Sequence, residues 1–160
     1  MDTKINAAPT IYAVEYKPRQ LTDIDYDDSV HDPVDAKEVY ELVRNINDPE
    51  HPYTLEQLNI THLDRIFVDD SENYILVQFA PTIPHCSAAS LIGLCIRVRL
   101  LRCLPERFKV DIKVVPGSHQ SEASVNKQLN DKERVAAALE NVHLLEVIDQ
   151  CLSTASMDDL

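Results

Sequence analysis

The stretch "ITHLDRIFVDDSENYILVQFAPT", residues 60–82, decides the fold. Two runs rich in β-branched and aromatic residues, 60–68 and 74–82, flank the polar segment "DDSEN" at 69–73. Runs of this composition that are separated by a turn-forming cluster predict the two strands of a β-hairpin. The centre of the chain is therefore an antiparallel pair of strands, and the flanking segments must supply the elements that cover it.

The segments after the hairpin predict a helix and a third strand. The apolar run at 86–104 is long enough for a helix, and the segment "FKVDIKVVPG" at 108–117 alternates apolar and polar residues as a strand does. The inward-facing stripe of this helix is expected to consist of Leu91, Leu94, Cys95 and Val98.

Helices are also predicted on both sides of this central region. "DPVDAKEVYELVRNI", at 32–46, predicts a helix with Asp32 as N-cap and Pro33 at the first helical position. The tail predicts one helix at 122–129 and a single longer helix that Asp131 caps and that runs to residue 152. The core face of the long helix is expected to contain Val135, Leu139, Val142, Leu145 and Ile148 or Leu152. The element order α, β, β, α, β, α predicts a small α/β (α+β) sandwich, in which helices pack on a short β-sheet.

The length of 160 residues indicates one domain with tails. Residues 1–33 are acidic and lack periodicity, which predicts a disordered arm; residues 34–155 form the domain and 156–160 a short tail. We find no signal-peptide pattern and no apolar run of membrane-spanning length. The four cysteines show no paired spacing typical of a disulfide framework, so we expect a reducing compartment, the cytoplasm or the nucleus.

Composition excludes several classes of function. Two glycines, Gly93 and Gly117, are too few for a glycine-rich phosphate loop. The net charge of −12 argues against direct binding of nucleic acid, because phosphate contacts require clustered cations. One segment, 97–113, is nevertheless basic, and we expect part of this basic strip to contact protein partners while other arginines turn inward. Its arginines are Arg97, Arg99, Arg102 and Arg107.

Cys86 lies at the predicted start of the helix 86–104. Unpaired N–H groups and the positive end of the helix dipole favour a thiolate there. His85 adjoins Cys86, and the hydroxyl of Thr82, four residues before, is available for a hydrogen bond. This pattern suits a nucleophile, a metal ligand or a redox sensor, whereas a lone cysteine among apolar residues is more often a buried hydrophobic residue. The residues alone leave these alternatives open.

The segment "NDPEHPYT", residues 47–54, predicts a rigid turn. Asp48 can bond its own backbone ahead of Pro49, and Pro52 prevents a helix from continuing. Glu50 is then held on a short loop. The simplest interpretation is a turn that ends a helix, and the alternative is a recognition surface.

The remaining cysteines and histidines predict less. Cys95 and Cys103 are expected in the core, and Cys151 is expected to be partly exposed and incidental. His51 is interpreted as a turn residue and His143 as a surface residue of the last helix. No close pairs of ligands predict a four-ligand zinc site.

Three long segments carry a resemblance to a known family: "RNINDPEHPYTLEQLNI", "FAPTIPHCSAASLIGLCIRVRLLRCLPERFKVDIKVVPGSH" and "SVNKQLNDKERVAAALENVHLLEVIDQCL". Together they cover roughly residues 34–153 and resemble the eukaryotic subunit of the cytosolic iron–sulfur assembly (CIA) targeting complex. That subunit belongs to the domain-of-unknown-function 59 family, which includes SufT-type proteins. The resemblance makes 34–155 a SufT-like iron–sulfur assembly domain.

The resemblance implies a non-enzymatic adaptor that helps to deliver iron–sulfur clusters to cytosolic and nuclear apoproteins, including enzymes of DNA replication and repair. It implies a WD-repeat β-propeller subunit and a HEAT-repeat scaffold subunit as partners, and a homodimer, since family members tend to dimerise. The family's acidic turn maps to Asp48, Pro49 and Glu50, and its threonine and hyper-reactive cysteine map to Thr82 and Cys86. No stably bound cofactor is expected, at most a transient cluster, and whether Cys86 is a ligand of that cluster stays open.

Two other functions are weighed against the adaptor. One is a thiol-based redox enzyme or thiol transferase with Cys86 as its nucleophile, which would need a base or a resolving cysteine nearby. The sequence offers His85 beside it, and the other cysteines are distant along the chain. The second is a purely structural bridge in which Cys86 is inert.

Overall fold

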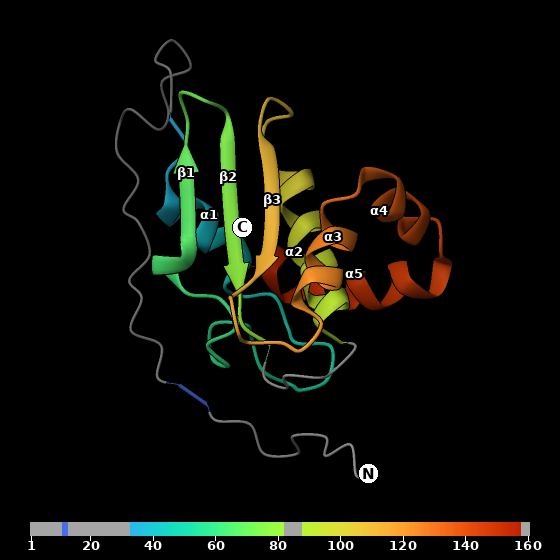
Figure 1. Cartoon of the computed structure of the whole chain (residues 1–160). Helices are drawn as coiled ribbons and strands as arrows, with labels where there is room; N and C mark the ends of the chain where they lie inside the picture. The colour runs from blue at the N-terminus through green and yellow to red at the C-terminus, as the bar shows by residue number, and fades with distance from the viewer. Residues whose placement is uncertain (1–10, 13–32, 82–87, 158–160) are drawn as a thin grey trace.

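The computed structural model describes residues 11–12, 33–81 and 88–157 of the chain (Figure 1). The helices and strands are, in order, α1 (Ala36–Val43), the 3₁₀ helix η2 (Leu63–Arg65), β1 (Ile66–Asp69), β2 (Tyr74–Phe79), α2 (Ala88–Cys103), β3 (Lys109–Val114), α3 (Glu122–Leu129), α4 (Lys132–Leu139) and α5 (Val142–Met157). The predicted α+β class is confirmed. Among the described residues, no helix combines the length and apolar character that crossing a bilayer requires.

The predicted hairpin is present as the antiparallel pair β1 and β2, with Asp69 opposite Tyr74 at its closed end. The Asp69 carboxylate accepts hydrogen bonds from the Ser71 hydroxyl (2.6 Å) and the Glu72 N–H (3.2 Å), and Asn73 adopts a positive φ of 55°. Asparagine tolerates this left-handed conformation better than most residues, so the polar turn closes without glycine.

The first strand is shorter than predicted. It begins at Ile66, because the residues before it form the 3₁₀ helix η2 and not extended backbone. His62 caps this helix: its Nδ1 accepts a hydrogen bond from the Asp64 N–H at 3.1 Å. A side chain that bonds nearby backbone in this way competes with strand pairing.

The third strand, β3, pairs in parallel with β2, so the sheet order is β1-β2-β3. A parallel connection needs a crossover, which α2 provides. Figure 1 shows α1 and α2 behind the sheet, where they cover one of its faces. The alternate strand residues that point toward these helices are buried: Ile66, Ile75, Val77, Phe79, Val110, Ile112 and Val114.

Helix α2 is buried over most of its circumference. Leu94, Cys95 and Val98 of the predicted stripe are buried, while Leu91 is half-buried. Burial extends beyond that stripe because α1, α3, α5 and β3 all pack against α2. The contact with α3 is so close that a Cβ added at Gly93 would lie 2.4 Å from Leu129 Cδ1. Gly93 therefore permits the approach of α3.

Helix α3 supplies hydrogen bonds to the outer edge of β3 through two asparagines. Asn126 Oδ1 accepts from the Val114 N–H at 2.7 Å, and Asn130 Oδ1 accepts from the Ile112 N–H at 3.0 Å. The Asn130 amide also donates to the Ile112 carbonyl at 2.9 Å. The asparagines bind the edge of β3 as a neighbouring strand would, which leaves that edge less available to other chains.

The predicted helix ends need two corrections. The first helix starts at Ala36, and its N-cap is Asp35, whose carboxylate accepts from the Glu38 N–H at 2.9 Å; Asp32 lies outside the described residues. In the tail, Asp131 is an N-cap, as predicted, but the prediction of a single long helix is wrong. Two helices, α4 and α5, replace it.

The break between α4 and α5 has a local cause. The Asn141 side chain accepts a hydrogen bond from the Leu144 N–H at 3.3 Å, which starts a new helix. Val142, predicted in the core face, is 68% exposed at the start of α5, whereas Val135 and Ile148 are buried as expected.

We expect Gly93→Val to lower the free energy of unfolding by about 2 kcal/mol, because buried Leu129 must shift to admit the new side chain. Urea denaturation measures the change. Leu101→Val, at an exposed position of the same helix, is the matched control and should change stability by less than about 0.5 kcal/mol. Equal stability of the two variants would show that α2 and α3 do not require this close approach.

We expect Asn130→Ala to destabilise the fold by about 2–3 kcal/mol, since it removes partners from the N–H and C=O of Ile112 at once. Asn130→Asp, which retains an acceptor but loses the donor, should cost less. Gln150→Ala, at an exposed position of α5, is the control. Thermal or urea unfolding of the three variants tests the order, and an Asn130→Ala protein as stable as the control would contradict it.

Candidate functional site

The predicted residues Thr82, His85 and Cys86 lie outside the described part of the chain. The described residues on either side place the ends of that segment. Ala80 donates its N–H to the Ile60 carbonyl at 2.9 Å, at the carboxyl end of β2. Helix α2 begins at Ala88, two residues after Cys86 in the sequence. The last residues described before that segment therefore lie beside the loop that ends at Ile60.

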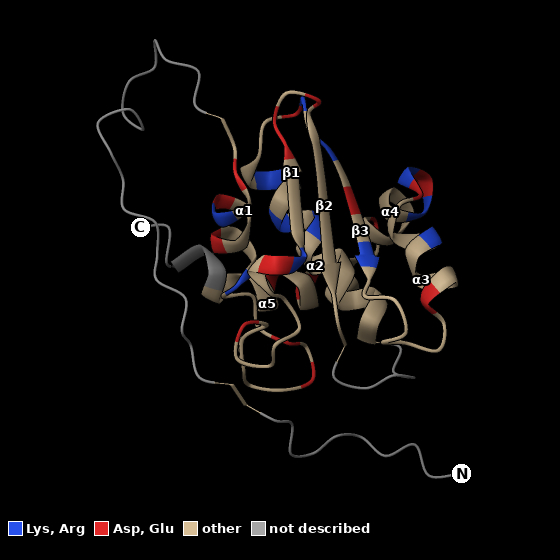
Figure 2. Ribbon diagram, turned by 60° about the vertical axis from the view of Figure 1, so that its left-hand side comes forward, with Lys and Arg blue, Asp and Glu red and all other residues tan. Residues whose placement is uncertain are grey.

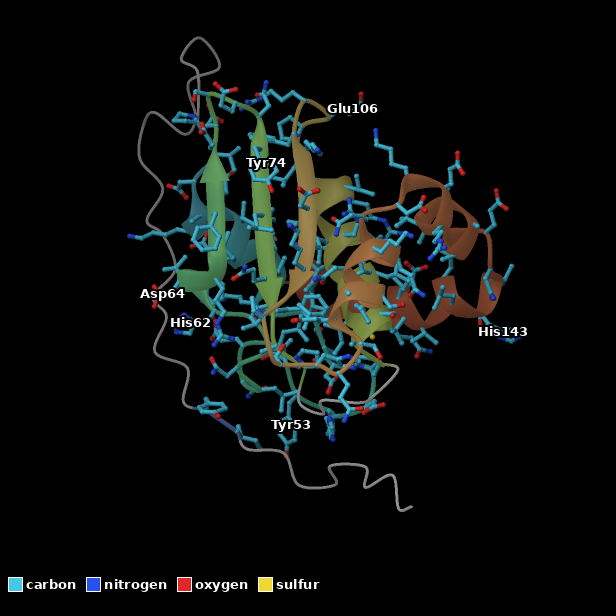
Figure 3. The ribbon with its side chains drawn as sticks, viewed as in Figure 1. Tyr53, His62, Asp64, Tyr74, Glu106 and His143 are labelled. Atoms are coloured by element: carbon cyan, nitrogen blue, oxygen red, sulfur yellow. The ribbon has the colours of Figure 1, made fainter. Side chains whose placement is uncertain are left out.

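That loop contains the acidic turn, Asp48, Pro49 and Glu50, which is closed by backbone hydrogen bonds. The Asp48 N–H donates to the Tyr53 carbonyl at 2.9 Å, and Asn47 pairs with Thr54 in an antiparallel bridge. Tyr53 lies at the end of the molecule below the sheet in Figure 3. The turn is therefore a fixed structure at the same end as the carboxyl end of β2.

Asp48 and His51 form a buried pair inside this turn. Asp48 Oδ2 lies 2.7 Å from His51 Nδ1, and the two residues are 6% and 8% exposed. Asp48 Oδ1 also accepts from the Glu50 N–H at 3.5 Å, the local backbone bond that the sequence predicts. Pro49 is half-buried and Glu50 is exposed. Neighbouring acids thus point in opposite directions, one inward and one toward solvent.

The environment of Asp48 disfavours its charge. Burial raises the pKa of the Asp48 carboxyl above its ordinary value of 3.8, and the hydrogen bonds from His51 and from the Glu50 N–H oppose that shift only in part. His51 was interpreted as a simple turn residue, and this interpretation missed the pair. The available signal is the spacing of an acid and a histidine three residues apart on a proline-bounded turn.

Two cysteines lie close to the acidic turn. Cys95 of α2 and Cys151 of α5 are buried, and the Asp48 carboxylate influences both thiols. Cys95 is in the core as predicted, but the prediction for Cys151 is wrong: it is 5% exposed, because its helix face packs on α2. The prediction for Cys103 is also wrong, since this last residue of α2 is exposed.

Two arginines of the basic strip turn inward, as expected for part of it. Arg99 is 6% exposed and its Nε donates to the Leu42 carbonyl at 3.0 Å, which ties α2 to α1. Arg97 donates to Asn130 Oδ1 at 3.0 Å, and burial lowers the pKa of its guanidinium. These contacts stabilise the packing of helices.

The other two arginines lie near the surface in ion pairs. Arg102 contacts Asp149 of α5 at 3.2 Å. Arg107 contacts Asp70 at 2.6 Å, and its guanidinium lies 4.1 Å from the ring centre of Phe108. Figure 2 shows basic and acidic residues side by side at the hairpin end of the sheet. The strip is therefore divided between separate places and not one continuous basic patch, and its role in partner binding stays a prediction.

No group of three histidine, cysteine or acidic side chains within residues 33–81 and 88–157 is arranged to hold a metal ion. Two of the histidines, His62 and His143, lie at opposite sides of the molecule (Figure 3). This arrangement offers no resident metal centre among the described residues.

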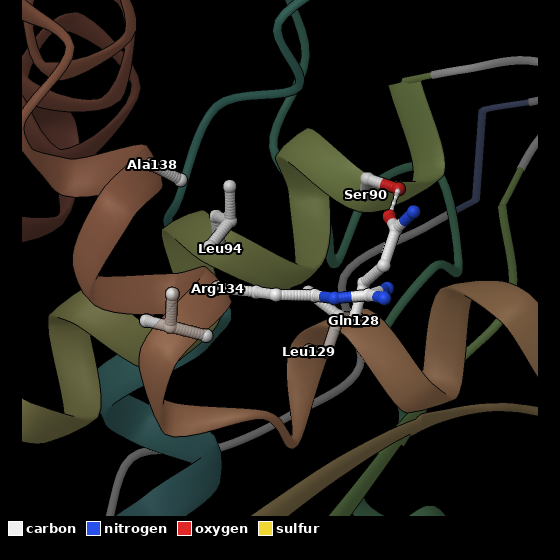
Figure 4. A pocket seen from close by; sticks show the side chains of 7 residues that line it. Ser90, Leu94, Gln128, Leu129, Arg134 and Ala138 are labelled. Atoms are coloured by element: carbon white, nitrogen blue, oxygen red, sulfur yellow. Dashed lines mark hydrogen bonds between the residues drawn. The ribbon is translucent and has the colours of Figure 1, made fainter.

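A cavity of about 360 Å³ lies between α2, α3 and α4 (Figure 4). It is lined by Ser90, Leu94, Gln128, Leu129, Arg134, Val135 and Ala138. Its polar groups already have protein partners: the Ser90 hydroxyl donates to Gln128 Oε1 at 3.4 Å, and Arg134 pairs with Asp131. The cavity carries no cluster of titratable groups that would suit catalysis.

The burial of Asp48 predicts a dependence of stability on pH. A carboxyl whose folded pKa is above its unfolded value loses stability as pH rises from 3.8 through the folded pKa. The stability of wild type minus that of Asp48→Asn should therefore fall as the pH is raised above 3.8, measured by urea unfolding.

Asp69→Asn is the control with the opposite sign. The Ser71 hydroxyl and the Glu72 N–H lower the pKa of Asp69, so wild type should gain stability over this variant as pH rises toward 3.8. If both differences followed the same slope, the burial of Asp48 would not govern its ionisation.

No known protein-family profile matches the chain. Individual relatives do match it over nearly its full length. The chain is 58% identical over 151 residues to cytosolic iron-sulfur assembly component 2B of Mus musculus, covering 94% of this chain and 92% of the relative. It is 57% identical to the MIP18 family protein galla-2 of Drosophila melanogaster, covering 96% and 98% of the two chains.

A third relative matches a shorter part of the chain. Cytosolic iron-sulfur assembly component 2B of Dictyostelium discoideum is 55% identical over 122 residues, which cover 76% of this chain and 75% of the relative. Two of these three relatives are named as assembly components, and that family is non-enzymatic. Matches at this level of identity over 94%, 96% and 76% of the chain show that it belongs to the MIP18 family, as a homologue of cytosolic iron–sulfur assembly component 2B.

Proposed function

We propose that this protein is a non-enzymatic adaptor of cytosolic iron–sulfur cluster assembly, which helps to deliver clusters to apoproteins. The observation that carries the proposal is the 58% identity to a protein named for this process, over more than nine-tenths of both chains. In this function the cluster is cargo. The adaptor holds it or its acceptor briefly, and the chain needs no resident metal centre.

Cys86 is the residue proposed to act in transfer. Thiolates are the usual protein ligands of iron–sulfur clusters, and a thiolate is favoured before a helix N-terminus, where N–H groups and the helix dipole are positive. The sequence places Cys86 two residues before the 16-residue helix α2. Thr82 and His85 are proposed to support the thiolate, and the acidic turn, which lies at the end of the molecule where β2 ends, is proposed to complete the site.

Partner binding is proposed at exposed groups on the acidic turn, on α2 and in the loop that follows α2. Glu50 on the acidic turn and Arg102 and Arg107 of the basic strip are exposed. The proposed partners are a WD-repeat β-propeller subunit, a HEAT-repeat scaffold subunit and client apoproteins, including DNA replication and repair enzymes. A second copy of the chain is a further proposed partner, and the proposed locations are the cytoplasm and the nucleus.

Cys86→Ser is expected to abolish delivery while the protein still folds. In cells depleted of the endogenous protein, iron incorporation into client proteins should fall roughly tenfold or more with this variant, because a hydroxyl is a poor substitute for a thiolate ligand. Radiolabelled iron in immunoprecipitated clients is the measurement.

Cys103→Ser, which changes the exposed cysteine at the other end of α2, is the matched control and should support normal delivery. Co-purification of both variants with the partner subunits separates loss of transfer from loss of assembly. Normal client iron content with Cys86→Ser would refute the role of this thiol. Turnover of a disulfide substrate by the purified protein would favour a thiol enzyme in its place.

A further inference from the structure

Cys95 and Cys151 meet where α2 packs on α5. Both side chains are in the hydrophobic core, with Cys95 fully buried and Cys151 5% exposed. Each thiol is the main influence on the pKa of the other, through a hydrogen bond from Cys95 to Cys151. Buried cysteines usually act as small apolar residues with apolar neighbours, so two buried thiols that influence each other need a further explanation.

The backbone around Cys151 is held in place by the loop before the acidic turn. The Asn47 N–H donates to the Cys151 carbonyl at 3.0 Å. One turn later, the Thr154 hydroxyl donates to the Asn45 carbonyl at 2.9 Å. These bonds hold the part of α5 that contains Cys151 in place, while α5 packs on the helix that carries Cys95.

We propose that Cys95 and Cys151 are an oxidation site, at which a peroxide converts the two thiols into an intramolecular disulfide between α2 and α5. This proposal does not rest on the function proposed above. It concerns two residues that lie outside the segment of Cys86, and neither the family nor the relatives' names assign them a role.

The burial and the hydrogen bond of the pair set the order of the reaction. The hydrogen bond from Cys95 lowers the pKa of Cys151, whereas the same bond and burial raise the pKa of Cys95. Cys151 is also the more exposed of the two residues. Its thiolate attacks one peroxide oxygen, the O–O bond breaks, and a sulfenic acid forms while the other oxygen leaves as water.

The Cys95 thiol then attacks the sulfur of the sulfenic acid. An S–S bond forms, the S–O bond breaks, and the oxygen leaves as a second water with the proton from Cys95. Two electrons pass from the two thiols to the peroxide, so the step balances. Only small molecules need to reach Cys151, because Cys95 is already hydrogen-bonded to it.

The disulfide would link the two helices that flank the acidic turn. It closes a covalent loop through β3, α3 and α4 and holds α5 against α2. Because Asn45 and Asn47 bond to the same part of α5, the oxidised chain would hold the base of the acidic turn more firmly.

The test uses the full chain with Cys86→Ser and Cys103→Ser, which leaves two of the four thiols. Circular dichroism verifies that the variant folds. After treatment with hydrogen peroxide and then catalase, the protein is unfolded and alkylated with N-ethylmaleimide, and intact mass gives the number of alkylated thiols.

The expected result is a loss of both alkylation sites, a monomer on a non-reducing gel, a proteolytic peptide pair that links residues 95 and 151, and recovery of both thiols with dithiothreitol. The disulfide should also form faster in the folded chain than in urea. The control carries Cys86→Ser and Cys95→Ser and keeps the exposed Cys103 and the buried Cys151. It should form no intramolecular disulfide.

Three results would overturn the proposal: two alkylated thiols after oxidation, a disulfide-linked dimer, or an equal rate in the folded and unfolded chains. Peptide mapping of the oxidised wild-type chain gives an independent answer if the double variant does not fold. In that experiment, absence of the peptide pair containing Cys95 and Cys151 would also overturn the proposal.

Discussion

The fold depends on the contact of α3 with the edge of β3 and with α2. The Asn130 side chain makes three hydrogen bonds in this contact: it accepts from the Ile112 N–H, donates to the Ile112 carbonyl, and accepts from Arg97 of α2. A three-stranded sheet of this size has exposed edges, which otherwise attract other chains. The asparagine side chains bond to one of them, while Gly93 lets Leu129 fill the space between the helices. One short helix thus completes both the sheet and the core.

The position of α3 also determines what the C-terminal helices can reach. Helix α4 follows α3 after the Asp131 cap, and α5 then returns to pack on α2. That return brings the carbonyl of Cys151 to Asn47 and the hydroxyl of Thr154 to Asn45. The acidic turn is therefore supported by residues about a hundred positions later in the chain. A site in the first third of the sequence is held by the last helix.

The sequence predicts the elements that local patterns determine and misses those that depend on distant contacts. Alternation and turn composition predict β2, β3 and the hairpin, because these signals lie within a few residues of each other. The burial of Cys151 depends on α5 packing against α2, which no local pattern records. The break at Asn141 was missed because the apolar periodicity continues across it, although an asparagine can begin a new helix wherever its side chain bonds the backbone ahead.

The acidic turn combines a buried acid, Asp48, with an exposed acid, Glu50. Its sequence predicts a rigid turn and a local bond from Asp48 to the backbone, and the structure has both. It does not predict that Asp48 turns inward to His51 while Glu50 stays exposed, because the loop's closure by Tyr53 and its support by α5 decide those directions. Burial disfavours the ionised form of Asp48. The hydrogen bond with His51 offsets part of this desolvation cost and positions the loop. Glu50, on the same turn as that inward pair, is exposed at the end of the molecule where β2 ends.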